Sequence, residues 1–165
     1  MAPGLDGGVT GMDFGRIFHT LTDHEPLHWQ SRLHARFMAG NLPPALDLPT
    51  GLGKTSVMAV WLAATIMGAP LPKRLVYVVD RRTVVDQATD EADKLKARAE
   101  AAGLLADLPI STLRGQHLDN RRWMEDPAAP AIIIGTIDMI GSRLLFQGYG
   151  VSTGLRPFQA GLIGA

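Results

Sequence analysis

The sequence predicts an α/β fold in which a mainly parallel sheet is covered by helices on both faces, giving three layers. Short runs rich in β-branched residues alternate with helical segments from about residue 45 onward, and this alternation is typical of parallel sheets. A glycine-rich turn between the first run and its helix supports this class, because ligands gather at strand carboxyl ends in such sheets.

The chain before this alternation is predicted to be a leader followed by helices. Residues 1–13 contain four glycines and one proline, a composition typical of a flexible segment. Residues 14–37 carry apolar residues at roughly helical spacing, interrupted by Pro26. We therefore predict two short helices here, within one domain that covers residues 14–165.

Four strands and four helices are expected after residue 44. β-branched content marks the strand at 74–79, and glycine or proline follows most of the helices. The tail at 147–165 has five glycines and weak periodicity, and we expect no final strand there. The predicted strands are 45–48, 74–79, 108–113 and 131–136, and the predicted helices are 54–67, 80–102, 119–125 and 137–146.

Composition restricts the class of protein. The chain has 16 basic and 16 acidic residues, so any contact with nucleic acid must come from local placement of charge. It has no cysteine, which excludes disulfides and fits a reducing cytoplasm. The start lacks the features of a signal peptide, and the apolar run at 57–67 is shorter than the roughly 20 residues needed to span a bilayer. We expect a cytoplasmic protein without a membrane span.

The motif that carries chemistry is a phosphate-binding loop at residues 48–55, which reads Leu-Pro-Thr-Gly-Leu-Gly-Lys-Thr. Gly51 and Gly53 allow backbone N–H groups to turn inward, and the following helix adds the positive end of its dipole. Lys54 is predicted to contact the β- and γ-phosphates of ATP, and the Thr55 hydroxyl to ligate Mg²⁺. Pro49, Thr50 and Leu52 complete the predicted cradle.

The loop resembles that of superfamily 2 helicases, which have Pro-Thr-Gly-x-Gly-Lys-Thr between a strand and a helix. The resemblance implies a RecA-like domain. Upstream, the segment near 25–33 resembles the glutamine motif of these helicases, with Gln30 in the position that reads adenine. A glutamine amide can both donate to and accept from the adenine edge. A surface glutamine on a helix is the alternative.

Three further segments resemble the motifs that contact the nucleic-acid strand in these helicases. Arg81 and Arg82 follow a predicted strand, as in motif Ia, and can carry charge to phosphates. Arg114 and Gly115 resemble motif Ib, and Thr136 has the position of the strand-contacting threonine of motif Ic. Each motif alone is explained by an ordinary turn, but their order on successive strand ends favours a site for single-stranded DNA.

Within superfamily 2, residues 77–87 and 134–150 resemble the helicase part of the CRISPR-associated helicase–nuclease of type I interference systems. The resemblance covers about residues 25–165 and implies a role in antiviral defence beside a CRISPR surveillance complex. Two alternatives remain: another superfamily 2 translocase, such as a type III restriction subunit, or a non-catalytic nucleotide-binding remnant.

One family motif is missing from the sequence. Members carry Asp-Glu-Ala-His or a similar motif, which holds magnesium through water, on the strand expected to begin near Ala165. The Asp-Glu pair at Asp90 and Glu91 lies instead in a charged predicted helix. We therefore expect the N-terminal portion of a longer enzyme, lacking the second RecA-like domain. Alone it should bind ATP but hydrolyse it poorly, because phosphoryl transfer depends on complete positioning and charge stabilisation.

Overall fold

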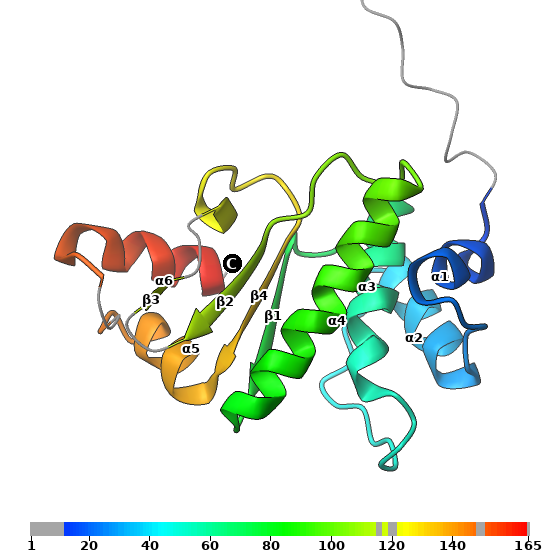
Figure 1. The fold of residues 1–165 in the computed structure, drawn as a ribbon, viewed down its shortest axis with the longest axis horizontal. Coiled ribbons are helices and arrows are strands. Elements are labelled where there is room, and N and C mark those ends of the chain that lie inside the picture. The colour runs from blue at the N-terminus through cyan, green and yellow to red at the C-terminus, as the bar shows by residue number, and fades with distance from the viewer. Residues whose placement is uncertain (1–11, 115–116, 119–121, 148–150, 165) are drawn as a thin grey trace, which may run out of the picture. The chain divides into compact units, whose positions relative to one another are not determined.

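The computed structural model describes residues 12–114, 117–118, 122–147 and 151–164 (Figure 1). The chain divides into two compact units. Unit 1 comprises Met1–Leu71 and Lys94–Asp107, and unit 2 comprises Pro72–Asp93 and Leu108–Ala165. The division falls within helix α4, Arg82–Ala101. The predicted leader lies outside the described residues except for Met12 and Asp13.

Unit 1 is helical. Helix α1, Phe14–Thr22, begins at Asp13, whose carboxylate accepts a hydrogen bond from the Arg16 N–H at 2.9 Å. Helix α2, His28–Met38, follows, so the two predicted helices are confirmed. Both pack against α3, Val57–Ile66. Seven of the ten α3 residues are buried, as expected of a helix that is apolar on all sides.

Unit 2 contains the sheet, in the order β1-β4-β2-β3. The first three strands in this order run parallel, whereas β3 is a short antiparallel addition to β2. The predicted fold class, α/β with a mainly parallel sheet, is therefore confirmed. The strands are β1, Arg74–Val79; β2, Ile110–Arg114; β3, His117–Leu118; and β4, Ala131–Thr136.

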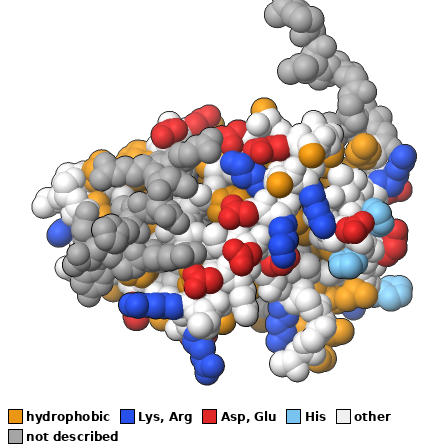
Figure 2. Space-filling view, in the orientation of Figure 1, with side chains coloured by type: hydrophobic (Ala, Val, Ile, Leu, Met, Phe, Trp, Pro, Cys, Tyr) orange, Lys and Arg blue, Asp and Glu red, His pale blue; other side chains and the backbone are white. Residues whose placement is uncertain are grey.

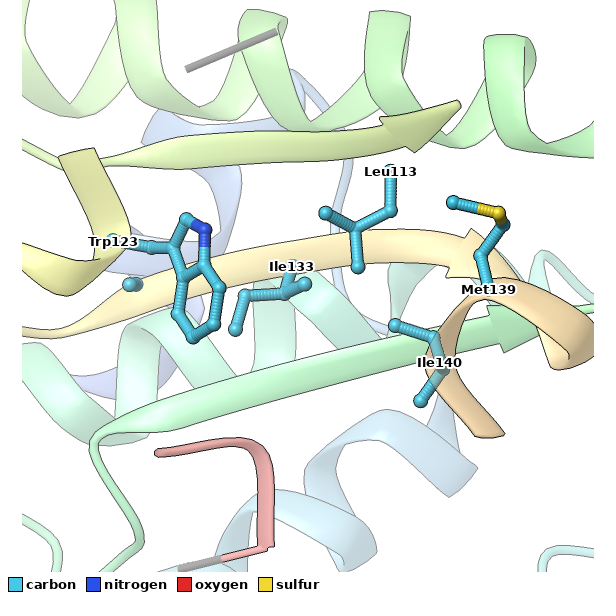
Figure 3. Packing of buried hydrophobic residues seen from close by; sticks show 6 residues of the cluster. Leu113, Trp123, Ile133, Met139 and Ile140 are labelled. Carbon is cyan, nitrogen blue, oxygen red and sulfur yellow. The ribbon is translucent and has the colours of Figure 1, made fainter. Parts of the chain in front are cut away.

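Helices cover both faces of this sheet. On one face the hydroxyls of Thr89 in α4 and Thr112 in β2 form a buried hydrogen bond of 2.9 Å. The other face carries helix α5, Ile137–Leu144, and helix α6, Arg156–Gly164, which contacts α5. Figure 3 shows the apolar cluster on this second face, in which strand residues meet side chains from α5 and from the short η2 turn, Arg122–Met124. Its buried members are Leu113, Trp123, Ala131, Ile133, Met139 and Ile140.

Several element predictions were wrong. Residues 45–48 form no strand, because they pair with no neighbour and Leu46 is 44% exposed. The helix after the loop starts as a 3-10 turn, Lys54–Ser56, and becomes α-helical only at Val57. Helix α6 lies in the tail, where none was expected, with Gln159 and Ala160 buried. The predicted helix at 119–125 reduces to η2, with residues 119–121 outside the described part.

Candidate functional site

The backbone of the glycine-rich loop in unit 1 turns through two left-handed residues. Gly51 has φ 86° and Gly53 has φ 63°. Residues other than glycine rarely adopt such φ values, since their Cβ atom then crowds the backbone. Gly53 caps the 3-10 turn that leads into α3. The left-handed conformations account for the two glycines of this loop, whose part in binding phosphate stays a prediction.

The charged and hydroxyl side chains of this loop lie where an anion can reach them. Lys54 is exposed and Thr55 is half-buried, and both follow directly on Gly53. Within the described part of the chain, the Lys54 ammonium has no carboxylate within ion-pair distance. Pro49 and Thr50 are exposed as well. The loop thus presents a cation to solvent just before the 3-10 turn that leads into α3, a helix whose dipole is positive at this end.

Gln30 is joined to the loop by hydrogen bonds. Its Nε2 donates to the Ser56 hydroxyl at 2.6 Å, and that hydroxyl donates to the Gly53 carbonyl at 2.6 Å. Its Oε1 accepts from the Leu27 N–H, also at 2.6 Å, and so satisfies a free donor at the start of α2. The side chain is 4% exposed. The structure therefore brings the predicted glutamine and the predicted loop together, through a serine that the motif did not include.

In unit 2, a cavity of about 340 Å³ opens at the carboxyl ends of the strands. It joins the residues after β1 to those after β4, and Leu113 of β2 lines it as well. Its rim is more acidic than basic, because one arginine lies among three carboxylates. The polar lining consists of Asp80, Arg82, Asp86, Thr136 and Asp138, and the apolar lining of Val85, Leu113 and Met139.

The strand-contact residues predicted from the sequence fall partly on this cavity. Arg82 and Thr136 line it, whereas Arg81 is highly exposed beside Asp80, with Nε 3.7 Å from the carboxylate. An exposed pair of this kind stabilises the fold little. Thr136 is the N-cap of α5, yet its side chain makes no capping hydrogen bond. Its hydroxyl is therefore not committed to the helix it precedes.

Of the two residues predicted from motif Ib, only Arg114 lies among the described residues. Arg114 is the last residue of β2, paired with His117 of β3, and Gly115 lies outside the described residues. The nucleotide residues belong to unit 1 and the strand-contact residues to unit 2. Sequence reasoning missed Ser56 and the cavity residues Asp86 and Asp138. For Asp86 there was a signal, since it lies one helical turn after Arg82, on the same face of α4.

Comparison with known proteins gives one family. A family model described as type III restriction enzyme, res subunit, matches residues 24–153, which include Gln30, the loop and the strand ends of β1, β2 and β4. The match and the parallel sheet identify a partial RecA-like P-loop domain of the superfamily 2 helicase type. No curated protein and no solved structure matches the chain. Among the described residues, no helix is long and apolar enough to cross a membrane.

Proposed function

Because the chain belongs to the family of the type III restriction enzyme res subunit, we propose that it is the ATP-binding portion of a superfamily 2 translocase acting on DNA. The observation that carries the proposal is the loop, in which two left-handed glycines precede an exposed Lys54 in the 3-10 turn that leads into the buried helix α3. These features together are suited to a di- or triphosphate, because they combine a glycine turn, the positive end of a helix dipole and a cation.

Within this site each group has a separate role. Lys54 holds the β- and γ-phosphate oxygens as a point charge, and the loop N–H groups hold the remaining oxygens. The Thr55 hydroxyl ligates Mg²⁺, which neutralises phosphate charge when bound. Asp90 and Glu91 lie exposed on α4, as expected of a solvated helix face. We therefore infer that Asp90 and Glu91 are not the acidic pair of a hydrolytic site, and that this chain binds ATP through the loop.

For the DNA contact, we propose the strand ends of unit 2. Arg81 and Arg82 supply the positive charge, and the free Thr136 hydroxyl supplies a donor. The cavity that Arg82 lines also carries three carboxylates, so we place the backbone of a single strand against the two arginines. Figure 2 shows acidic and basic side chains interspersed on one face of the chain, which agrees with contacts that depend on local placement.

Two biological settings fit this activity. The resemblance of residues 77–87 and 134–150 favours a helicase of CRISPR interference, whose partner is a CRISPR surveillance complex. The family match favours a subunit of a type III restriction system. Sequencing the genes beside this one separates the two: interference genes and a repeat array support the first setting, and genes of a restriction–modification system support the second.

The nucleotide site is tested with Lys54→Ala. Loss of a charge-assisted contact is expected to weaken the binding of ATP with Mg²⁺ about ten- to a hundredfold, measured by titration calorimetry. Lys73→Ala is the matched control, because it removes an exposed lysine outside the loop and should leave the affinity unchanged. Equal ATP binding by wild type and Lys54→Ala would refute the phosphate assignment.

A further inference from the structure

The hydrogen bonds that run from α2 to the phosphate loop have only one possible direction. The Leu27 N–H can only donate, so the atom that receives it is the oxygen of the Gln30 amide. The Gly53 carbonyl can only accept, so the Ser56 hydroxyl spends its single hydrogen there. The same hydroxyl must then accept from the Gln30 NH₂ group. These three hydrogen bonds, from the Leu27 N–H through Gln30 and Ser56 to the Gly53 carbonyl, form a relay in which every donor meets an acceptor.

In this relay, both the oxygen and the nitrogen of the Gln30 amide already have hydrogen-bond partners. An amide oxygen can accept a second hydrogen bond and an NH₂ group can donate a second one. A base must reach those positions to use them, and the side chain is only 4% exposed. Adenine could therefore pair with this amide only after it had been pulled away from Leu27 and Ser56, leaving a free helix N–H and an unpaired serine oxygen.

The relay ends at Gly53, one of the two loop residues with a left-handed backbone conformation. Gly53 has a positive φ, and its carbonyl receives both the Ser56 hydroxyl and the Ser56 N–H, the latter at 2.9 Å. Lys54 is the next residue. The relay therefore fixes the direction of the peptide unit from which the lysine side chain leaves, and it does so from a helix outside the loop.

We propose that Gln30 is a positioning residue that holds the phosphate loop through Ser56, and that this site binds nucleoside triphosphates by their phosphates without selecting adenine. The inference rests on the proposed nucleotide site and deepens it. It assigns Gln30 a different task from the adenine reading that the helicase resemblance implies.

The first experiment measures base selectivity in the wild-type chain. A fluorescent ATP analogue bound in the presence of Mg²⁺ is displaced with ATP, with GTP and with inorganic triphosphate. The affinities for ATP and GTP are expected to agree within about threefold, less than one hydrogen bond to the base would produce. Inorganic triphosphate should also compete. A preference for ATP of about tenfold or more would overturn the proposal.

The second experiment tests the positioning role with two variants. Gln30→Glu still accepts from the Leu27 N–H but cannot donate to Ser56, and Ser56→Ala removes the hydroxyl while the amide stays. Each should weaken ATP and GTP alike, by about three- to tenfold, and the double variant should be no weaker than either single one. A purely structural role would instead lower the thermal midpoint of Gln30→Glu and leave its affinity unchanged.

The outcomes separate this inference from the proposed function. If Gln30→Glu loses affinity for ATP and keeps it for GTP, the amide reads adenine and the inference fails, while the nucleotide site stands. If no triphosphate displaces the analogue, or if Lys54→Ala binds as wild type does, the nucleotide site itself fails. Should Gln30→Glu not fold, Ser56→Ala and the wild-type ratio of affinities decide the question.

Discussion

The phosphate loop of unit 1 and the strand ends of unit 2 differ in what determines their shape. The loop consists of consecutive residues, is largely exposed, and owes its shape to two glycine conformations and one relay of hydrogen bonds. The strand ends collect residues from three separate segments, and a buried apolar cluster beneath them packs against those segments. Substitutions in the loop should therefore change binding first, and substitutions under the strand ends should change stability first.

The largest effect is expected from Trp123→Ala. Trp123 is fully buried in the cluster of unit 2, so its removal leaves a large cavity. We expect the free energy of unfolding to fall by about 3–5 kcal/mol, measured by urea denaturation. Trp123→Phe is the control: it keeps most of the ring and removes an indole N–H that has no hydrogen-bond partner among the described residues. Equal losses in the two variants would contradict this account of the cluster.

A smaller loss of stability is expected from Gly135→Ala, at the end of β4. An added Cβ would lie 3.2 Å from the Leu113 Cβ and 3.3 Å from side-chain carbons of Ile140, so one of these neighbours must move by a few tenths of an ångström. We expect a loss of about 1–3 kcal/mol in the free energy of unfolding. Gly141→Ala is the matched control in α5, where an added Cβ meets nothing within 4 Å. It should be neutral or stabilising, by up to about 1 kcal/mol, and a loss there would argue against close packing as the cause.

Gly53→Ala tests whether the left-handed conformation of the loop matters more for binding than for stability. There is room for the methyl group, since its nearest neighbour is the Ser56 Oγ at 3.9 Å, but φ is 63°. The free energy of unfolding should fall by only about 1–2 kcal/mol. Affinity for ATP should fall as well, because an alanine that relaxes to negative φ turns the loop N–H groups away. Unchanged affinity, measured by calorimetry, would show that the left-handed turn is not needed for the nucleotide.

The strand ends should change binding when charge rather than packing is removed. Arg81→Ala combined with Arg82→Ala is expected to flatten the salt dependence of single-stranded DNA binding, by roughly 1.4 in the slope of log K against log salt. Stability should stay within about 0.5 kcal/mol, since both side chains are exposed. The control, Arg32→Ala with Lys73→Ala, removes the same charge elsewhere. An equal change in both double variants would mean that net charge alone is responsible.

The smallest effect is a pH dependence in unit 1. His34 is 8% exposed and its ring is stacked on Phe14, with centroids 4.0 Å apart. Burial lowers the pKa of His34 below its ordinary value of 6.5, so the folded state favours the neutral ring. Its contribution to stability is present above pH 6.5 and is lost as pH falls from there through the lower folded-state pKa. The thermal midpoint should therefore drop between pH 7 and 5, and the drop should be smaller in His34→Phe.

Much of the sheet was predictable from the sequence. The predicted strands at 74–79 and 131–136 agree with β1 and β4 residue for residue, because each is a short run rich in β-branched residues. The segment 45–48 has a similar short apolar pattern but forms no strand, since a strand exists only where a neighbour accepts its hydrogen bonds. Local sequence carries the propensity of such a segment and not the presence of a partner.

The candidate site likewise has a part that local sequence predicts and a part that depends on the fold. Residues 48–55 predict a phosphate loop because glycine conformation, lysine charge and helix start all act over a few neighbouring residues. The bond from Gln30 to Ser56 spans 26 positions, and the cavity after β1 and β4 spans more than fifty. Both depend on which helix and which strand the folded chain sets beside one another. Sequence alone therefore determined the chemistry of the loop, whereas tertiary structure decided what holds the loop and which charges share the strand ends, because packing brings together residues that chain spacing leaves far apart.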